Sequence, residues 1–279
     1  MATAMFIFSC VDGLSKYVMD TYSVVQVLWF RYLFLVVLSV TIAAWRGGLA
    51  MMRTQRPWLQ VVRSVLLVVQ VGLFVYGFKH LQMAHVNSIG AAAPLLVTAL
   101  SLPILGERVG IRRWIAVGIG FAGVLLVHRP GLGVVHPVSF WVLLGTLLFA
   151  VFQIMTRVLA RTDSSETTLA YSSVIGAALL TLVVTFYWGQ VWTTPDVSGW
   201  TLLTLVAVLG GVGHFLLIIS LQSAPPVVLQ PLFYTILVWS TIVGFVVFGD
   251  IPDSPTVIGA LLIVSSGLYT QFRERRLQE

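Results

Sequence analysis

Charged side chains are scarce in this sequence. Asp, Glu, Lys and Arg make up 9% of the 279 residues, and hydrophobic residues make up 58%. An average soluble domain has about 25% charged residues. Charge is nearly absent from ten successive stretches of about twenty residues, the length at which a helix spans the hydrocarbon core of a bilayer. This scarcity excludes an ordinary soluble domain, and we expect an all-α integral membrane protein.

Other absences exclude further classes of protein. The single cysteine, Cys10, cannot build a disulfide framework. The predicted spans hold no His-Glu-x-x-His pattern and no paired aspartates, which disfavours an intramembrane enzyme and predicts no metal or cofactor site. We find no repeated rings of charge or filter loop of the kind that channels use. The connections are too short to hold a soluble domain through which a membrane scaffold could signal. A channel and a non-transporting membrane scaffold are therefore both remote alternatives.

Gly, Pro and charged residues divide the apolar stretches into ten predicted helices. Because the connections are short, consecutive helices should be antiparallel neighbours. The first helix begins almost at Met1 and lacks the charged start and cleavage site of a signal peptide, so we expect it to be retained. The predicted spans are residues 2–19, 24–45, 58–79, 84–105, 113–127, 138–158, 167–188, 200–221, 227–248 and 256–272.

Arginine returns at alternate gaps between the spans. We number the connections between spans from the N-terminus. The odd-numbered connections hold only Lys79 and Arg129. The even-numbered connections and the C-terminal tail hold eleven arginines: Arg46, Arg53, Arg56, Arg108, Arg112, Arg113, Arg157, Arg161, Arg273, Arg275 and Arg276. By the positive-inside rule, this asymmetry places both termini in the cytoplasm of a multi-pass protein, which we assign to a bacterial inner membrane. Contacts with lipid headgroups account for the net charge of +6, so no nucleic-acid partner is expected.

The two halves of the chain are similar. Leu81-Gln82 closes the third span and Leu221-Gln222 closes the eighth; Gly106-Glu107 follows the fourth and Gly249-Asp250 the ninth. These matches predict two repeats of five helices, residues 1–130 and 131–279. An odd number of spans turns the second copy over, and such inverted repeats enclose a shared cavity near the bilayer midplane.

Charged residues inside the spans mark candidate functional positions. Asp12 and Lys16 have an i,i+4 spacing that allows direct pairing, and Arg31 should lie at the same level on the next helix. This cluster could be a structural clasp or gate strut, or it could contact a substrate carboxylate or couple to protons. We expect Arg63 and Lys79, near helix ends, to reach the headgroups.

Uncharged polar and aromatic residues complete the candidates. His214 follows a glycine-rich run on the eighth span, where it could be hydrogen-bonded packing or a proton relay. Tyr234 and Trp239 lie too deep for the interfacial belt and could stack on a ligand or pack in the core. Amides and hydroxyls cannot stay unsatisfied in lipid, so we expect the others to face the interior: Gln70, Tyr76, Asn87, Gln153 and Tyr171.

Three prolines interrupt predicted spans. Pro94 and Pro103 lie in the fourth span and Pro231 lies in the ninth. Each proline removes a backbone donor and can break or kink its helix. Corresponding interrupted helices in two halves indicate where a central substrate site lies.

Several short motifs in both halves of the sequence resemble those of a known family. Pro94-Leu95-Leu96, Gly106-Glu107-Arg108 and Gly120-Phe121-Ala122-Gly123 in the first half, and Leu229-Gln230-Pro231 with Phe248-Gly249-Asp250 in the second, are similar to EamA-like members of the drug/metabolite transporter superfamily. The resemblance covers essentially the whole chain. It implies ten helices in two inverted repeats, with helices three, four, eight and nine around the cavity, and transport of amino acids, vitamins or nucleotide derivatives.

These observations together predict a secondary transporter that works by alternating access. We expect export of amino acids or similar amphipathic compounds; the alternative is uptake of a vitamin or nucleoside-like cofactor. The expected partners are a small-molecule substrate, the lipid bilayer and possible coupling protons, with the protein as a monomer or homodimer.

Overall fold

The computed structural model describes residues 1–46, 53–105, 111–128, 136–223, 229 and 232–278. Over these residues the chain forms helices and no β-strand. The helices are α1 (Ala2–Val18), α2 (Val24–Arg46), α3 (Pro57–His80), α4 (Met83–Gly90), α5 (Ala93–Leu105), α6 (Ile111–His128), α7 (Val138–Leu159), α8 (Ser165–Phe186), the short α9 (Trp188–Val191), α10 (Val197–Ser223), α12 (Thr235–Phe248) and α13 (Ser254–Gln278).

The helix lengths and composition fit a membrane-spanning protein. Among the described residues, five helices are long and apolar enough to cross a bilayer, namely α2, α3, α7, α8 and α10. Four shorter apolar helical segments lie at 83–97, 114–127, 235–248 and 254–269. Together with α1, which carries Asp12 and Lys16, they account for the ten predicted spans. The chain is an all-α integral membrane protein.

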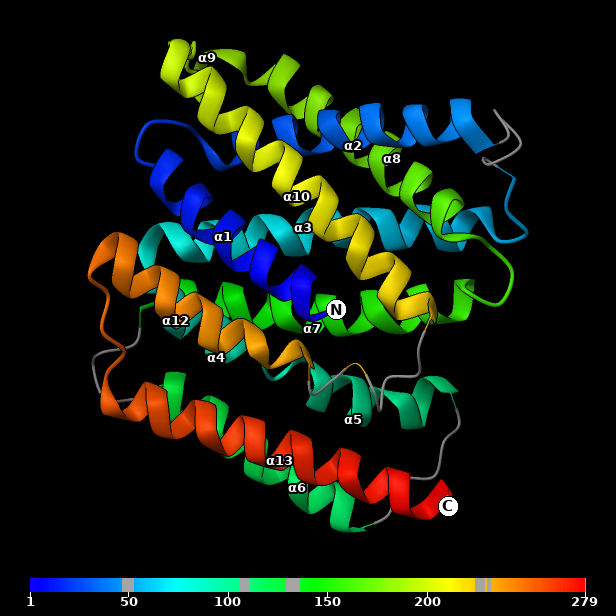
Figure 1. The fold of residues 1–279 in the computed structure, drawn as a ribbon, viewed down its shortest axis with the longest axis vertical. Helices are drawn as coiled ribbons and strands as arrows, with labels where there is room; N and C mark the ends of the chain where they lie inside the picture. The colour runs from blue at the N-terminus through cyan, green and yellow to red at the C-terminus, as the bar shows by residue number, and fades with distance from the viewer. Residues whose placement is uncertain (47–52, 106–110, 129–135, 224–228, 230–231, 279) are drawn as a thin grey trace.

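Helices from the two halves interlock (Figure 1). The most extensive contacts between helices are those of α6 with α13, α3 with α7, and α2 with α8 and α10. The first helix, α1, packs against both α10 and α12. Every one of these pairs joins an element of the first half to an element of the second. The space where α1, α3, α10 and α12 approach one another is therefore bounded by both halves.

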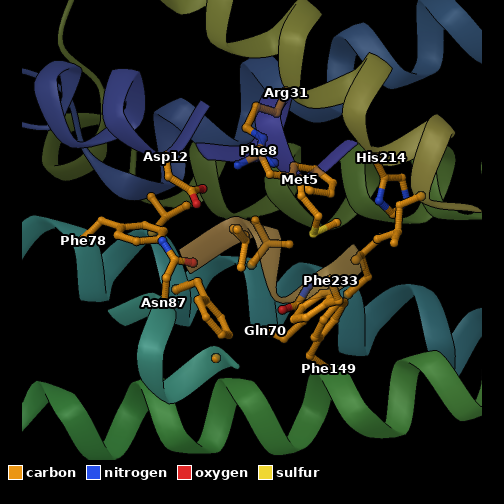
Figure 2. Close-up of a pocket in the computed structure, with 17 residues that line it drawn as sticks. Met5, Phe8, Asp12, Arg31, Gln70, Phe78, Asn87, Phe149, His214 and Phe233 are labelled. Carbon is orange, nitrogen blue, oxygen red and sulfur yellow. The ribbon is translucent and has the colours of Figure 1, made fainter. Parts of the chain in front are cut away.

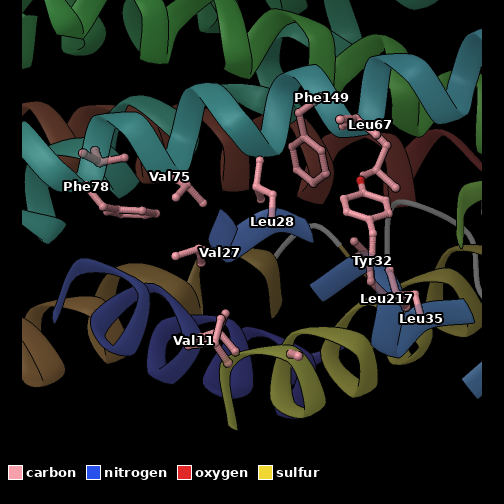
Figure 3. Packing of buried hydrophobic residues seen from close by; sticks show 14 of the residues in the cluster. Val11, Val27, Leu28, Tyr32, Leu35, Leu67, Val75, Phe78, Phe149 and Leu217 are labelled. Atoms are coloured by element: carbon pink, nitrogen blue, oxygen red, sulfur yellow. The ribbon is translucent and has the colours of Figure 1, made fainter. Parts of the chain in front are cut away.

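Packing between these helices depends on close approach. Buried side chains such as Val11, Val75 and Leu217 fill the spaces between α1, α3 and α10 (Figure 3). A Cβ at Gly77 would lie 2.5 Å from Val142 Cγ2, so only glycine allows α3 and α7 to approach this closely. Because lipid is as apolar as these side chains, van der Waals packing at such small residues, rather than the hydrophobic effect, holds membrane helices together.

The predicted fourth span is divided into two helices. α4 ends at Gly90 and α5 begins at Ala93, so Pro94 occupies the second position of α5 after a turn at Ala91 and Ala92. Proline suits this position because the first helical N–H groups have no partner within the helix. By contrast, α5 continues through Pro103 to Leu105 without a break. Pro231 lies outside the described residues.

A buried carboxylate joins the α7–α8 turn to the start of α3. Asp163 is 7% exposed, and its Oδ2 accepts hydrogen bonds from Thr54 Oγ1 at 2.5 Å and Gln60 Nε2 at 2.7 Å. Burial alone would raise the pKa of Asp163, but the hydrogen bonds from Thr54, Gln60, Thr162 and the Gln55 backbone outweigh it and lower the pKa. The charged form of Asp163 therefore stabilises this end of the bundle.

We expect the Asp163→Asn variant to lower the apparent melting temperature at pH 7 by about 3–8 °C, since hydrogen bonds to a charged group each contribute about 1.5–3 kcal/mol. A lowered pKa means that the stabilisation is complete above the unfolded pKa of about 4 and disappears as the pH falls through the folded value. Melting curves between pH 7 and pH 3 should show the two proteins converging on acidification. Asp20→Asn, at an exposed position in the α1–α2 turn, is the control. A difference that persists below pH 3 would mean that charge is not the cause.

Candidate functional site

A cavity lies at the centre of the bundle, where both halves meet (Figure 2). It encloses about 760 Å³ of atom-free space, including the part open to solvent. Its walls come from α1, α2, α3, α4, α7, α10 and α12 and from the residues just before α12. The lining residues are Met5, Phe8, Asp12, Arg31, Leu67, Gln70, Val71, Phe74, Val75, Phe78, Asn87, Gly90, Phe149, His214, Leu217, Phe233 and Ile236.

Five of the predicted candidates line this cavity. Asp12 and Arg31 are partly exposed to it, whereas Gln70, Asn87 and His214 are buried in its walls. Asp12 of α1 and Arg31 of α2 attract each other, and the Asn87 side chain of α4 points toward Asp12 and interacts with it (Figure 2). The cavity thus carries one acid, one base and three neutral polar groups.

One polar atom in the cavity wall has no partner among the described residues. His214 Nε2 is buried and makes no hydrogen bond to any of them, whereas the buried Asn87 amide interacts with the Asp12 carboxylate. An unpaired buried polar group costs about 1–3 kcal/mol, so native proteins rarely keep one without a reason. A ligand entering the cavity would supply the missing partner. The aromatic walls formed by Phe8, Phe74 and Phe233, with a few convergent polar groups, are typical of a site for a small organic molecule.

Gly210 provides the room that Arg31 needs. A Cβ at Gly210 of α10 would lie 2.8 Å from Arg31 Nε, closer than real side chains approach. The sequence pattern of glycines before His214 therefore has a specific role in the structure: it lets α10 pack against α2 while the guanidinium points into the cavity.

Replacing Gly210 with alanine should displace the guanidinium without preventing folding, because the end of a long side chain can move. We expect transport to fall about 10- to 100-fold, since a displacement of about 1 Å at a binding group can cost that much. Transport assays on the folded variant measure this effect. Gly118→Ala is the matched control, because a Cβ at Gly118 meets nothing within 4 Å. Equal losses in both variants would point to a general helix effect instead.

Lys16 does not pair with Asp12, contrary to the sequence prediction. Its Nζ lies 2.6 Å from Oδ2 of Asp250 and 4.6 Å from the centroid of the Phe248 ring. Gly249 adopts a left-handed conformation with φ of 68°, ends α12 and turns Asp250 toward α1. The i,i+4 spacing pointed to a partner on the same helix, whereas the turn after α12 supplies a partner from the other half of the chain.

Further contacts join α1 to α12 on the N-terminal side of Lys16, and together with the Lys16–Asp250 pair we call them the α1–α12 seam. Ser9 Oγ donates to the Ile236 carbonyl at 3.4 Å, and a Cβ at Gly13 would lie 2.6 Å from Val243. Ser9, Gly13 and Lys16 are spaced four and three residues apart, so they share one face of α1. Both helices line the cavity, and the Lys16–Asp250 pair fixes them together beside the α1–α2 turn.

The remaining candidates lie outside the cavity lining. Tyr76 is 40% exposed and contacts the His80 ring, and Trp239 makes an edge contact with Phe6. Tyr234 is buried in a separate cluster with Ile263. Gln153 is buried on α7, and Tyr171 is partly exposed on α8.

Arg63 does not reach the headgroups, and this corrects the sequence prediction. The side chain has no exposed surface, and its guanidinium donates to Thr156 Oγ1, to the Thr168 carbonyl and to Ser172 Oγ. The position of Arg63 near a helix end suggested lipid contact, but α7 and α8 cover this face of α3.

The phenylalanines of the cavity wall were not predicted. On α3, the cavity-lining residues are Leu67, Gln70, Val71, Phe74, Val75 and Phe78. These positions follow the i, i+3, i+4, i+7 spacing of one helix face. The stripe that contains Gln70 is the sequence signal that could have identified them.

Comparison with known proteins places this architecture in context. The model of the EamA-like transporter family matches residues 1–129 and again residues 136–270. An S-adenosylmethionine uptake transporter of Rickettsia prowazekii is 28% identical over 268 residues, covering 95% of this chain and 88% of that protein. A riboflavin transporter of Rhizobium johnstonii is 26% identical, covering 83% and 76%. One solved crystal structure has the same fold, with a TM-score of 0.69, 17% identity and coverage of 100% and 98%.

The names of these relatives bear on the predicted direction and substrate. They do not support the predicted export of amino acids. They agree better with the alternative, uptake of a vitamin or nucleoside-like cofactor.

Proposed function

The chain belongs to the EamA-like transporter family, and we propose that it takes up a nucleoside-like cofactor, with S-adenosylmethionine as the first candidate. As a member of this family it is a multi-pass membrane transporter and not an enzyme. The observation that carries the proposal is the composition of the cavity. It combines aromatic walls with one carboxylate and one guanidinium.

S-adenosylmethionine offers a partner for each of these groups. Its carboxylate suits Arg31, because a guanidinium binds a carboxylate through two parallel hydrogen bonds. Its ammonium suits Asp12, and its sulfonium would be attracted to the faces of nearby phenylalanine rings. The adenine ring can stack on Phe74 or Phe149, while the amides of Gln70 and Asn87 can bind its edge.

Riboflavin is the second candidate, supported by the names of several relatives. Its flavin ring fits aromatic walls and amide groups equally well. Riboflavin carries no charge, however, so it would make no ionic contact with Asp12 or Arg31. The two charges in the cavity therefore favour S-adenosylmethionine, whose amino acid group carries a carboxylate and an ammonium.

Transport would proceed by alternating access between the two inverted repeats. In this scheme, the α1–α12 seam with the Lys16–Asp250 pair closes the cavity toward the outside of a bacterial inner membrane. Opening of the seam would admit the substrate to Asp12 and Arg31. A proton gradient or simple facilitated diffusion would set the direction, with both termini in the cytoplasm.

Uptake into proteoliposomes that contain the purified protein tests the proposal. We expect labelled S-adenosylmethionine to accumulate, unlabelled S-adenosylmethionine to compete, and amino acids to compete poorly. Running the assay with and without a pH gradient separates coupled from facilitated transport. Uptake of riboflavin alone would select the second candidate. Failure to take up either cofactor would contradict the proposed function.

A further inference from the structure

A guanidinium is fully buried outside the cavity lining. Arg63 lies on α3 against α7 and α8 and has no exposed surface. Its Nη1 donates to Thr156 Oγ1 at 3.3 Å, and its Nη2 donates to the Thr168 carbonyl at 2.8 Å and to Ser172 Oγ at 2.5 Å. All three acceptors are uncharged, so none of them balances the positive charge.

No carboxylate among the described residues lies within ion-pair distance of Arg63. Tyr32 and then Asp163 are the groups that act on it electrostatically, and Asp163 already accepts hydrogen bonds from Thr54 and Gln60. Arg63 Nε is buried and makes no hydrogen bond to any described residue. A buried charge without a counter-ion is expensive, and in membrane proteins such charges usually mark a substrate path.

The helix positions of Ser172 and Gln153 match those of Arg31 and Asp12. Arg31 is the eighth residue of α2 and Ser172 is the eighth of α8, the corresponding helix of the second repeat. Asp12 is the seventh residue from the end of α1, and Gln153 is the seventh from the end of α7. Arg63 therefore bonds to Ser172 at the helix position that Arg31 occupies in the first repeat. At the helix position of the Asp12 carboxylate, the second repeat has an amide whose Nε2 is buried without a described partner.

One aromatic ring separates Arg63 from the cavity wall. The Phe152 ring centroid lies 5.1 Å from Arg63 Cζ and 6.3 Å from the His214 ring. It also stacks on Phe149 at 6.0 Å and 13°. His214 and Phe149 both line the cavity (Figure 2). Rotation of the two phenylalanines would open a route from the cavity to the guanidinium.

We propose that Arg63, Thr156 and Ser172 form a second binding station, which receives the carboxylate of the transported molecule after it leaves Arg31. Nε is free and adjacent to Nη2, so a carboxylate could bind both nitrogens by displacing the Ser172 hydroxyl. That hydroxyl now also donates to the Thr168 carbonyl at 2.8 Å and can turn to donate to the incoming oxygen. This inference rests on the proposed function in that a carboxylate-bearing substrate passes through the cavity.

Two variants of nearly equal size test whether the station lacks a negative charge. Ser172→Asp supplies a fixed carboxylate beside Arg63, and Ser172→Asn supplies the same shape without charge. If the charge is unbalanced, the Asp variant should melt about 5 °C higher than the Asn variant, because a charge-assisted bond replaces a neutral one. An Asp variant that melts at or below the Asn variant would overturn the proposal.

Small anions test whether the station binds a ligand. At equal ionic strength, sodium acetate should raise the melting temperature of the wild type by about 2–4 °C relative to sodium chloride. The Asn variant should keep this shift, and the Asp variant, whose station is already filled, should lose it. Identical melting in all salts, or a shift with inorganic phosphate but not acetate, would overturn the assignment to a carboxylate.

Transport completes the test. Both variants change a residue of the station, but Ser172→Asp should take up S-adenosylmethionine at least about tenfold more slowly than Ser172→Asn, because a fixed carboxylate excludes that of the substrate. Equal uptake by the two variants would contradict the station. If the wild type takes up no cofactor, the proposed function fails, and the melting and acetate comparisons still decide whether Arg63 binds an anion.

Discussion

Replacing Arg31 with Gln should reduce uptake of the substrate about 100-fold or more. The guanidinium is the partner that we assign to the substrate carboxylate, and it also balances Asp12 inside the protein. Removing one partner of a hydrogen-bonded charged contact with a ligand costs about 2–5 kcal/mol of binding, and about 1.4 kcal/mol corresponds to tenfold in affinity. Uptake of labelled S-adenosylmethionine, normalised to folded protein, measures the effect. Lys79→Gln, at an exposed position at the end of α3, is the control.

The partner variant separates substrate binding from stability. Asp12→Asn should also impair uptake, and the Asp12→Asn/Arg31→Gln double variant should melt higher than the Arg31 variant alone, because no unpaired charge remains. The double variant should nevertheless transport poorly. Wild-type uptake by the Arg31 variant or by the double variant would show that the pair is a structural clasp and not part of the substrate site.

Reversing one charge of the Lys16–Asp250 pair should also lower uptake strongly, although less than the loss of Arg31. Lys16→Asp places two carboxylates together where the wild type has an ion pair of 2.6 Å, with the two side chains 18% and 19% exposed. Juxtaposed like charges cost several kcal/mol, so the α1–α12 seam should open and uptake should fall at least about tenfold. Proteoliposome uptake at low and high salt is the measurement, since salt screens part of the repulsion.

The charge-swapped double variant Lys16→Asp/Asp250→Lys is the matched control. It restores an ion pair with the opposite orientation and should recover uptake to within about threefold of the wild type. Uptake that stays low in the swapped variant, or that never falls in the single variant, would mean that the pair does not control access to the cavity.

The spans could be predicted from sequence because the bilayer imposes their length. Predicted residues 138–158 compare with Val138–Leu159 in α7, and predicted residues 24–45 compare with Val24–Arg46 in α2. Lipid cannot hydrogen-bond to an unpaired backbone group, so a membrane span must be helical. The length of each apolar stretch and the Gly, Pro and charged residues that separate the stretches are therefore enough to predict the spans. Polarity also singled out Asp12, Arg31, Gln70, Asn87 and His214, which the structure brings together around one cavity.

Partners between distant helices could not be predicted. Lys16 meets Asp250 because of a left-handed turn 233 residues after it, and no spacing within α1 contains that information. Arg63 is covered by α7 and α8, although its distance from the helix end suggested lipid. On α3 the stripe that contains Gln70 marks Phe74 and Phe78. Elsewhere, helices that are apolar on every side give a weak periodicity, so the sequence did not show that Phe8, Phe149 and Phe233 face the cavity.

Protection of a cavity cysteine by substrate tests most directly that the central cavity is the binding site. In a Cys10→Ala background, Val71→Cys places one thiol in the cavity wall, and Leu182→Cys places one on the exposed face of α8 as the control. We predict that S-adenosylmethionine slows maleimide labelling of Cys at position 71 about tenfold or more and leaves labelling at position 182 unchanged. Unchanged labelling at position 71 in a protein that still transports S-adenosylmethionine would contradict the account.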